Sequence, residues 1–517
     1  MKKTYFLLVV LIFSAPLYAE EIHSKGLGGG DWSNPNTWTK GKVPQAADVA
    51  VIAARDVVIF DRNDADKPTC ASLLIDPSGA LIFQTNQTGE KHPIIMNVAG
   101  IIESYGSIKI DASDDDKTHM ELRLAGPDNA SRKLSILRGG SLAVVGRSDL
   151  PENKCNVIIS APPLVPQSEL GIITAEKNTM LDIQHAQIEY IRIDATNIDN
   201  TGSKPNERLN LISNMFARSS CLNLTGCDTP AILKNIFTPE PVNPMALAIL
   251  NVAGCPLADI RDNKLTGPAR WGLQVRGECS ATGNTIEKCI NGISWTSPNG
   301  MMKRNTVKDC ESGIQLTSMT GSIEDTSIEN CKLAIESTSS VAQLTNVRIS
   351  DSKTPTVTLV SSSLSLLNCD IKKAQIKTTG APNTQPELPW VQAMQFVVVK
   401  LTGKVPDNVV VDIKTAKPDK PLAPGAMDLN VRNSPAIVRS DTTPPADSPS
   451  ALVVNTWGIA RDGKALGPID YTLTVMEPAA KATDKPKILK TLAIKPEDSW
   501  YRSEISDSKP TLEVNIP

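Results

Sequence analysis

The sequence is poor in the residues on which many catalytic and metal sites depend. Only four histidines occur among 517 residues, at His23, His92, His119 and His185, and they are scattered along the chain. Protein zinc sites use His and Cys side chains at short spacings, so a histidine-based zinc site is not expected. The sequence also lacks a phosphate-binding glycine loop, a Gly-x-Ser-x-Gly elbow and a Cys/His set at metal-ligand spacing.

An excess of one sign of charge is lacking as well. Lys and Arg total 53 against 56 Asp and Glu, which gives a formal net charge of -3 at pH 7. Proteins that bind nucleic acid or anionic membranes usually present basic surfaces. The balanced composition therefore argues against nucleic acid and against anionic lipid as partners.

A long apolar run is found only near the N-terminus. Lys2 and Lys3 precede the apolar residues Phe6–Phe13, and the stretch ends at Ala19 in a small-residue sequence suited to cleavage. The run is too short to span a bilayer, and no later segment is apolar for about 18 residues. Residues 1–19 are therefore predicted to be a secretory signal, with an uncleaved membrane anchor as the alternative. The mature chain is expected to be soluble, without a membrane span, and secreted, periplasmic or at the cell surface.

What the sequence does contain is a repeat. Between about residues 260 and 375 one short pattern returns roughly every 21 residues. Its apolar positions form three columns: Ile286, Val307, Ile328, Ile349 and Ile371; Ile293, Ile314 and Ile335; Ala281, Met302, Ile323, Leu344 and Leu366. A fixed period indicates stacked units, and short strands separated by bends are typical of a right-handed parallel β-helix. A solenoid of helical hairpins would need longer repeats and helical spacing.

Two polar ladders support the same register. The first is a column of asparagines at a bend, Asn263, Asn284 and Asn305. Stacked amides at such a bend can satisfy one another and the turn backbone. The second is a row of alternating charge beside the apolar column, Glu287, Lys308 and Glu329, as neighbouring strands prefer. Surface stabilisation is the simpler interpretation of these charges, and catalysis is the alternative.

The ten cysteines would normally suggest a disulfide framework in an exported protein. Three of them, Cys289, Cys310 and Cys331, share one column of the repeat and cannot all pair with one another. We expect these three to be buried thiols that fill the core. Cys221 and Cys227, close together in the sequence, are the better candidates for a bridge.

The repeat also divides the chain, which is expected to be all-β. Residues 166–381 are assigned to the right-handed parallel β-helix. Upstream, residues 20–165 carry short strands split by glycines and polar turns, and they are expected to form an N-terminal β domain. Downstream, residues 382–517 contain strands without the fixed period and predict a β-sandwich of immunoglobulin-like size.

The beginning of the mature chain resembles a G8 domain. Such domains open with a Trp-x-x-Pro-x-Thr-Trp phrase, found here from Trp32 to Trp38, followed by Gly-x-Val-Pro at Gly41–Pro44 and by Asp48 before the first strand. The resemblance covers residues 29–150, with further glycine-marked phrases. It implies a β-rich cap in which the two tryptophans close the apolar end of the β-helix. Where a G8 domain precedes a β-helix, some members of the family degrade hyaluronan and others have no assigned chemistry.

Two further resemblances concern the rest of the chain. The 21-residue coils are similar to the generic repeats of pectate-lyase-like proteins, and Pro424–Leu429 is similar to carboxypeptidase regulatory-like modules. They imply a β-helix followed by a β-sandwich. The segment Asp149–Asp182 departs from the pattern of the hyaluronan-degrading animal members, so their activity is not carried over.

Candidate ligand-binding residues occupy outward positions on the second strand of the coils. They are Arg270, Gln274, Arg276, Thr296, Thr317 and Thr338. The threonines predict a hydroxyl ladder at a coil spacing of about 4.8 Å, which suits the hydroxyls of an extended sugar chain. The alternative is that threonine simply suits exposed strands. Trp271 and Trp295 are either sugar-stacking side chains or, in their inward register, part of the core.

An enzyme would need other groups. Arg270 and Arg276 are of the type that a lyase places near a uronate, often with calcium, although surface ion pairs are the simpler interpretation. The acidic run Asp111–Asp116 lacks the glycine and distal glutamate of an EF-hand loop and is expected to be a solvated loop. A glycoside hydrolase would need two catalytic carboxylates, and the sequence spacing of the Asp and Glu residues identifies no such pair. Calcium is the one cofactor that the sequence leaves open.

These patterns predict an exported, non-catalytic β-helix protein that binds extended polysaccharide or acts as a surface or adhesion component. No catalytic residue and no metal ligand is assigned. The alternative is an enzyme, a polysaccharide lyase or glycoside hydrolase, that cleaves an acidic glycan on the face carrying Arg270 and Arg276.

Overall fold

The computed structural model of the chain describes residues 19–84, 92–114, 118–151, 154–163, 170–198, 208–238, 248–353, 355–371, 375–381, 389–404, 409–415, 436–437, 452–460, 463–466, 471–477, 479, 485–494 and 511–517. These residues form β-strands and one short 3-10 helix, η1 (Pro35–Thr37), which confirms the predicted all-β class. No helix in the described ranges is long and apolar enough to cross a membrane. The chain divides into two compact units, Met1–Ser220 and Cys221–Pro517.

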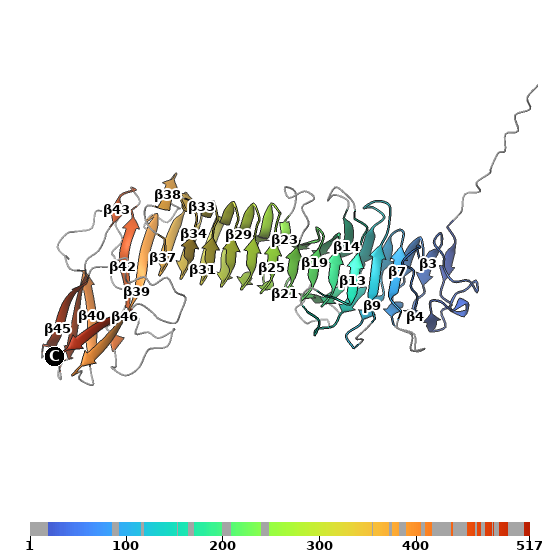
Figure 1. Cartoon of the computed structure of the whole chain (residues 1–517), viewed down its shortest axis with the longest axis horizontal. Coiled ribbons are helices and arrows are strands. Elements are labelled where there is room, and N and C mark those ends of the chain that lie inside the picture. Colours follow the sequence, from blue (N-terminus) through green and yellow to red (C-terminus); the bar gives the residue numbers. More distant parts are fainter. Residues whose placement is uncertain are drawn as a thin grey trace, which may run out of the picture. The chain divides into compact units, whose positions relative to one another are not determined.

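The first unit is built from three parallel ladders of strands, and each coil adds one strand to a ladder (Figure 1). The first ladder contains β1 (Glu21–His23), β3 (Val49–Ile52), β5 (Ser72–Ile75), β8 (Ile102–Ser104), β11 (Lys133–Ile136), β14 (Gly171–Ala175) and β17 (Ile191–Thr196). The second contains β2 (Gly29–Asp31), β4 (Val57–Phe60), β6 (Ala80–Phe83), β9 (Ser107–Asp111), β12 (Ser141–Val145), β15 (Met180–Gln184) and β18 (Arg208–Ile212). The third contains β7 (Ile94–Val98), β10 (Met120–Leu124), β13 (Val157–Ser160), β16 (Gln187–Glu189) and β19 (Met215–Ala217).

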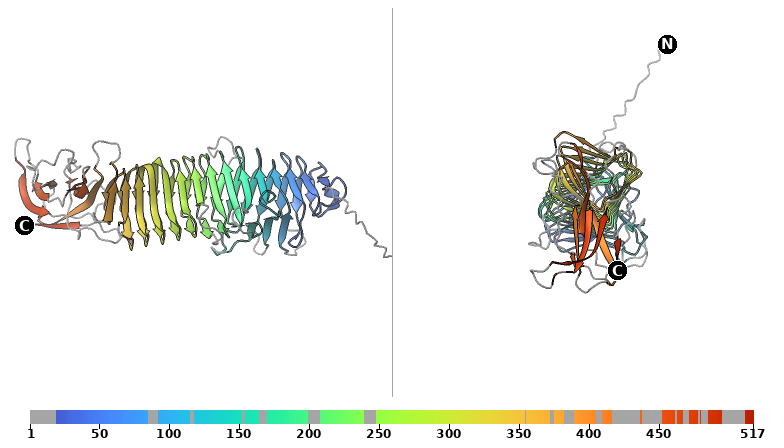
Figure 2. Two further views of the ribbon diagram at one scale, coloured as in Figure 1. Left: turned by 90° about the horizontal axis from the view of Figure 1, so that it is seen from above. Right: turned by 90° about the vertical axis from the view of Figure 1, so that its left-hand side faces the viewer.

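The second unit has three ladders of the same kind, and its strands lie side by side in successive coils (Figure 2). Its first ladder contains β20 (Cys221–Thr225), β23 (Ala248–Ala253), β26 (Trp271–Arg276), the beginnings of β29 (Asn291–Lys303) and β31 (Ser312–Glu324), β33 (Leu333–Thr338), β36 (Val357–Val360) and β38 (Ile376–Thr379). Its second ladder contains β21 (Ala231–Leu233), β24 (Asp259–Arg261), β27 (Ser280–Thr282), the ends of β29 and β31, β34 (Val341–Thr345), β37 (Ser363–Leu367) and β39 (Val391–Gly403). Its third ladder contains β22 (Ile236–Thr238), β25 (Lys264–Thr266), β28 (Thr285–Glu287), β30 (Thr306–Lys308), β32 (Ser327–Glu329) and β35 (Arg348–Ser350). The coils form the predicted right-handed parallel β-helix.

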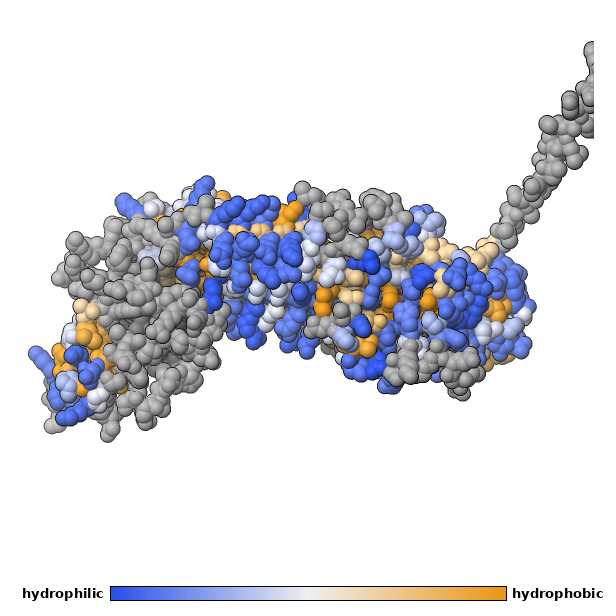
Figure 3. All heavy atoms as spheres, viewed as in Figure 1, coloured by the Kyte–Doolittle hydropathy of each residue, from blue (hydrophilic) through white to orange (hydrophobic). Residues whose placement is uncertain are grey.

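The three apolar columns predicted from the repeat are confirmed. Ile286 pairs with Val307, Val307 with Ile328, and Ile328 with Ile349. The columns that begin at Ile293 and Ala281 pair in the same way, and all of these side chains are buried. Burial of each large aliphatic side chain contributes roughly 1.5–3 kcal/mol, so the thin core gains its stability from stacking. In the space-filling view, the outer surface over β29 and β31 is largely hydrophilic (Figure 3).

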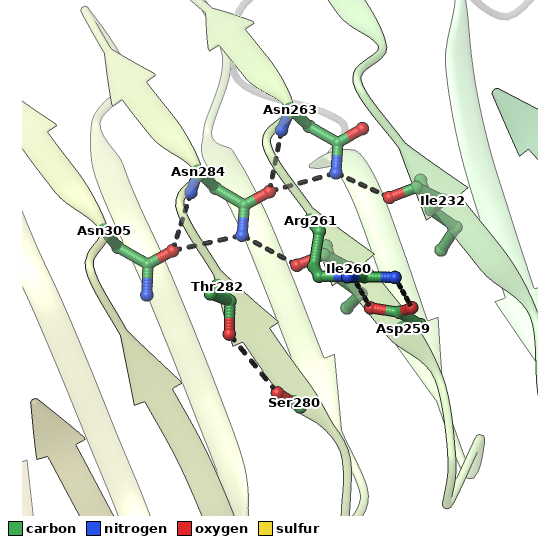
Figure 4. Close-up of polar contacts among 9 residues, drawn as sticks. All are labelled: Ile232, Asp259, Ile260, Arg261, Asn263, Ser280, Thr282, Asn284 and Asn305. Atoms are coloured by element: carbon green, nitrogen blue, oxygen red, sulfur yellow. Dashed lines mark hydrogen bonds and ion pairs between the residues drawn. The ribbon is translucent and has the colours of Figure 1, made fainter. Parts of the chain in front are cut away.

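The asparagine column forms a continuous ladder of buried hydrogen bonds (Figure 4). The side-chain amide of Asn263 donates to Oδ1 of Asn284, and that of Asn284 donates to Oδ1 of Asn305, each over 3.0 Å. The same amides donate to main-chain carbonyls, those of Ile232 and Ile260 respectively. On the neighbouring strands, Lys308 pairs with Glu287 at 2.8 Å, as the alternating charges predict. These contacts confirm the predicted register.

The stack of coils begins earlier in the chain than the sequence predicts. Parallel pairing starts at β1 and β2, and the β11–β14 and β12–β15 pairs cross residue 166 without any change. Residues 20–165 are therefore wound as parallel coils. The repeat was not visible there because the coils differ in length: Leu73 pairs with Ile102, whereas Leu134 pairs with Ile173.

An aromatic cluster fills the first coils. Trp32 and Trp38 are fully buried and pack edge to face, with ring centroids 4.9 Å apart. Trp32 also packs against Phe60 at 5.4 Å, and Phe60 against Phe83 at 5.3 Å. The indole N–H of Trp38 donates to the carbonyl oxygen of Trp32 over 3.0 Å. The tryptophans of the opening phrase thus extend the apolar core into the first coils.

The C-terminal strands form two arrangements. Strand β39 pairs with β37 in the second ladder, and also with β42 (Leu452–Ile459), which pairs with β43 (Ala465–Leu466), and with β46 (Thr511–Ile516). A separate antiparallel sheet has the order β41 (Ala436–Ile437), β40 (Val410–Thr415), β44 (Tyr471–Glu477) and β45 (Lys487–Ile494). One strand therefore belongs both to the coils and to the region after residue 382. The predicted signal peptide, apart from Ala19, and the segment Pro424–Leu429 lie outside the described residues.

None of the ten cysteines is in a disulfide, and the predicted Cys221–Cys227 bridge is wrong. The backbone N–H of Cys227 instead donates to Sγ of Cys255 over 3.3 Å. The column of Cys289, Cys310 and Cys331 is buried as predicted. Each of these thiols donates to the carbonyl oxygen two residues before it, at 3.5, 3.3 and 3.4 Å. The thiols act as small buried side chains that also satisfy bend carbonyls.

Candidate ligand-binding groove

A sharp bend separates the first and second ladders of the second unit. Ser318, Ser339 and Ser361 have positive φ angles of 51°, 52° and 48° at this bend. The following serines, Ser340 and Ser362, are fully buried. The Ser340 hydroxyl accepts from the backbone N–H of Met319 over 3.0 Å, and the Ser362 hydroxyl accepts from the N–H of Ser340 over 3.1 Å. Both hydroxyls also donate to carbonyls of the preceding strand at 2.9 Å. This serine ladder, which was not predicted, fixes where the second ladder begins.

An open groove of about 540 Å³ runs over the second ladder just after that bend. It is lined by Asn299, Gly300, Thr320, Gly321, Ser322, Val341, Ala342, Gln343, Ser363, Leu364, Ser365, Pro389 and Gln392. Successive side chains of a strand point to opposite faces. Because Ala342 and Leu364 are buried, the neighbouring Gln343 and Ser365 point outward. The lining therefore presents polar groups on an apolar floor.

The outward groups of the groove form a row in coil register. Ser322 pairs with Gln343, Gln343 with Ser365, and Ser365 with Gln392. Such neighbours on parallel strands lie about 4.8 Å apart. A second row beside it joins Thr320, Val341 and Ser363 through the same pairings. Ser363 is 4% exposed, and its Oγ has no hydrogen-bond partner among the residues that the structure describes.

Two glycines, Gly300 and Gly321, line one end of the groove. A Cβ atom added to Gly321 would lie 2.1 Å from the carbonyl oxygen of Gly300, and one added to Gly300 would lie 2.2 Å from the indole nitrogen of Trp295. Both distances are shorter than any van der Waals contact, so only glycine fits. Trp295 itself is fully buried, which confirms its assignment to the core. The indole ring thus supports the backbone that lines this end of the groove.

The groove contains no charged lining among the residues that the structure describes: its side chains are hydroxyls, amides and small apolar groups. The charged pair that follows on the same strands, Lys303 and Glu324, is 3.2 Å apart and neutralises itself. The hydroxyl of Ser322 donates to Glu324 over 3.4 Å. The site is therefore polar but has no net charge of its own.

The six predicted ligand-binding residues lie on the other side of the bend, on or beside the first ladder. Thr296 pairs with Thr317, and Thr317 with Thr338, so the predicted hydroxyl ladder exists. Gln274 belongs to the outward row beside it, where Gln315 donates to Glu336 over 2.9 Å. None of the six is among the described residues that line the groove.

The two predicted arginines occupy different surroundings. The Arg270 guanidinium lies 4.2 Å from the ring centroid of Trp271, which is half-buried. Because Trp271 is only half-buried, it is not a core residue, contrary to the interpretation from its register, and Arg270 packs on its ring. Arg276 is exposed at the end of β26.

The acidic run begins on strand β9 and continues beyond it. The Asp111 carboxylate accepts from the backbone N–H of Ser113 over 3.2 Å and lies 3.1 Å from Lys109. Burial alone would raise the pKa of Asp111, but the bonds from Ser113 and Lys109 together lower it. Asp115 and Asp116 lie outside the described residues. Within the described ranges, no three His, Cys, Asp or Glu side chains are placed to hold a metal ion.

No family model matches the chain, and no curated protein matches it. Among solved structures, it is similar to full-length tailspike protein 2 from Escherichia coli O157:H7 bacteriophage CAB120, with 8% sequence identity and a TM-score of 0.16. The alignment covers 86% of this chain and 59% of the tailspike chain, so this protein spans less than two thirds of that length. The parallel pairing of successive coils defines the fold.

Proposed function

We propose that this protein is an exported, non-catalytic binder of extended polysaccharide, which it holds in the groove of the second ladder. The observation that carries this proposal is the row of Ser322, Gln343, Ser365 and Gln392 in coil register. Hydroxyl and amide side chains both donate and accept hydrogen bonds, as sugar hydroxyls do. A polymer with repeated hydroxyls can therefore meet the same kind of group on each coil.

The composition of the groove favours binding over catalysis. General acid–base catalysis needs a titratable side chain within hydrogen-bond reach of the substrate. Glycoside hydrolysis needs two carboxylates about 5–10 Å apart. The described lining offers neither, since it consists of Asn, Gln, Ser, Thr and apolar residues. The alternative, a lyase or hydrolase using Arg270 and Arg276, receives less support because Arg270 packs on Trp271.

Export and the N-terminal assignment are part of the same proposal. The basic and apolar pattern of residues 1–19 supports secretion to the periplasm, the surface or the medium. We assign the G8-like opening phrase, Trp32 to Trp38, the role of an aromatic plug for the first coils. An uncovered β-helix end exposes core and unpaired edges, so an exported stack of coils benefits from such a plug.

The test is affinity electrophoresis of the purified chain in gels that contain neutral or uronate polysaccharides, followed by a reducing-end assay on the same samples. We expect retardation in at least one gel and no new reducing ends. Gln343→Ala should weaken retardation about tenfold. Thr317→Ala, which removes an outward polar side chain from the first ladder, is the control and should change retardation less than about twofold. Release of sugar ends, or retardation in no gel, would reject the proposal.

A further inference from the structure

Building on that proposed function, we infer that the groove takes one chemical class of glycan: an uncharged β-1,4-linked chain in an extended, twofold ribbon, lying along the stacking direction of the coils. Two features of the groove carry this inference, its neutrality and the order of its outward residues. An orphaned hydroxyl in its lining adds a third.

The neutrality of the lining selects against acidic polysaccharides. A carboxylate that leaves water for a protein groove needs a cation or several donors to replace its hydration. The described lining supplies no cation, and Lys303 beside it is already paired with Glu324 at 3.2 Å. Uronate chains would therefore lose hydration without compensation. Neutral sugar hydroxyls exchange water for Ser, Thr and Gln groups of the same hydrogen-bonding capacity.

The order of the outward residues selects the linkage. Along the row, short and long side chains alternate: Ser322, Gln343, Ser365, Gln392. The pattern repeats at every second coil, or about 9.6 Å for a spacing of about 4.8 Å per coil. In a twofold β-1,4 chain each sugar is turned over relative to the last, so one edge also returns at every second sugar. An α-1,4 chain curls and cannot keep step with a straight row of strands.

Ser363 supports a ligand at this place. It lines the groove and is 4% exposed, and its Oγ lacks a hydrogen-bond partner in the described part of the chain. Buried hydroxyls are nearly always hydrogen-bonded, so one that is left over calls for an explanation. Its neighbours in the same row are Thr320 and Val341. A sugar held over this row offers a hydroxyl to Ser363 and an apolar ring face to Val341.

The experiment is isothermal titration of the full chain with four hexasaccharides: cellohexaose, mannohexaose, maltohexaose and hexagalacturonate. We expect at least one of the two β-1,4 hexaoses to bind about tenfold tighter than the other two sugars. Affinity should rise with chain length and level off at about four or five sugars, because four outward residues form the row.

Two substitutions locate the recognition. Ser365→Gln removes the alternation of short and long side chains without adding charge. It should weaken binding of the preferred hexaose at least about fivefold. Ser294→Gln makes the same change on the outward row of the first ladder, next to Gln274, and should leave affinity within about twofold. Circular dichroism checks that both variants keep their strands.

The outcomes distinguish a wrong glycan class from a wrong proposed function. Equal or tighter binding of maltohexaose or hexagalacturonate, weakened by Ser365→Gln, would overturn the assignment of a neutral twofold glycan and leave polysaccharide binding in place. Binding of a β-1,4 hexaose that is weakened by Ser294→Gln and not by Ser365→Gln would overturn the groove as its site. Failure of all four sugars here, together with no retardation in any polysaccharide gel, would overturn the proposed function itself.

Discussion

The side-chain amide of Asn284 donates to Oδ1 of Asn305 over 3.0 Å, and the backbone N–H of Asn284 donates to the same oxygen over 3.0 Å. Asn284 in turn accepts from both the backbone and the amide of Asn263. The fully buried Asn284 side chain thus accepts two hydrogen bonds from the preceding coil and donates to the coils on both sides. The ladder fixes the bend between the second and third ladders and ties each coil to the next.

Replacement of Asn284 by alanine should therefore be costly. It leaves the Asn263 donors and the carbonyl of Ile260 without their partner, and each buried unsatisfied group costs about 1–3 kcal/mol. We expect a loss of about 3 kcal/mol in the free energy of unfolding, measured by urea titration. Asn291→Ala removes an exposed amide hydrogen bond to Arg270 and should cost less than about 1 kcal/mol. Equal losses for the two variants would contradict the role of the ladder.

The aromatic cluster of the first coils gives a second prediction. Trp32 is fully buried between Trp38 and Phe60, so Trp32→Ala should cost about 3–5 kcal/mol through lost contacts and a cavity. Hydrogen exchange should show the loss first in β1 to β4. Leu27→Ala, at an 84% exposed position in the same region, is the control and should change nothing. Unaltered protection of β1 to β4 in Trp32→Ala would show that the cluster does not hold these coils.

The sequence predicted the columns of the regular coils because each of their residues recurs at a fixed step. The asparagine ladder and the column of Ile286, Val307 and Ile328 followed from that step alone. The earlier coils could not be found in this way, since loops of different length separate their strands. Phe60 pairs with Phe83, whereas Val145 pairs with Gln184, and no single period covers both.

The groove was missed for a different reason. Alternation along a strand tells which side chains point outward, but it does not tell where a long strand bends from one ladder to the next. Strands β29 and β31 run through that bend, and the buried Ser340 and Ser362 that fix it look like ordinary strand serines in the sequence. The recurrence of Ser322, Gln343 and Ser365 was the available signal. Gln392 falls after a break in the repeat and needed the β37–β39 pairing to join the row.

Acid should weaken the first unit through Glu121. Arg123 donates to its two oxygens over 3.1 and 2.9 Å, the Ser160 hydroxyl donates to one of them, and His119 lies 3.7 Å away. Burial by itself raises the pKa of Glu121, but the bonds from His119, Arg123 and Ser160 outweigh it and lower that pKa to about 2. Because an unfolded glutamate titrates near about 4.3, the stabilisation is complete above about pH 5 and is lost as the pH falls towards 2.

The matching variant is Glu121→Gln. Its free energy of unfolding at pH 7 should be lower than that of the wild type by on the order of 2 kcal/mol, and the difference should shrink as the pH is lowered. Urea titrations between pH 7 and pH 3 measure this convergence. Glu103→Gln, at an exposed position on β8, should give a small difference of less than about 0.5 kcal/mol. A difference for Glu121→Gln that is constant with pH would refute the assignment.

Gly321 should be intolerant of any side chain. The added Cβ of Gly321→Ala would lie 2.1 Å from the carbonyl oxygen of Gly300, so two coils must separate locally. We expect a loss of about 1–3 kcal/mol in stability and weaker glycan binding, since both residues line the groove. Ala342→Gly, one coil further on, makes the reverse change and should cost about 0.5–1 kcal/mol without a clash. Gly321→Ala with unchanged stability and binding would show that the coils have room to spare.

Thiol reactivity tests whether the cysteines are buried and unpaired. Burial raises the pKa of Cys279 and Cys289 to about 12 and that of Cys155, which is only half-buried, to about 11. The thiolate is the reactive form, so at pH 8 the native chain should react slowly with Ellman's reagent. Cys155 should react faster than the buried thiols. Unfolding in guanidinium should expose ten reactive thiols. Cys155→Ser should remove the first native phase, whereas Cys289→Ser should leave it in place and lower the denatured count by one. Fewer reactive thiols in the unfolded wild type would mean that a disulfide forms, and would contradict the stacked-thiol arrangement of the coils.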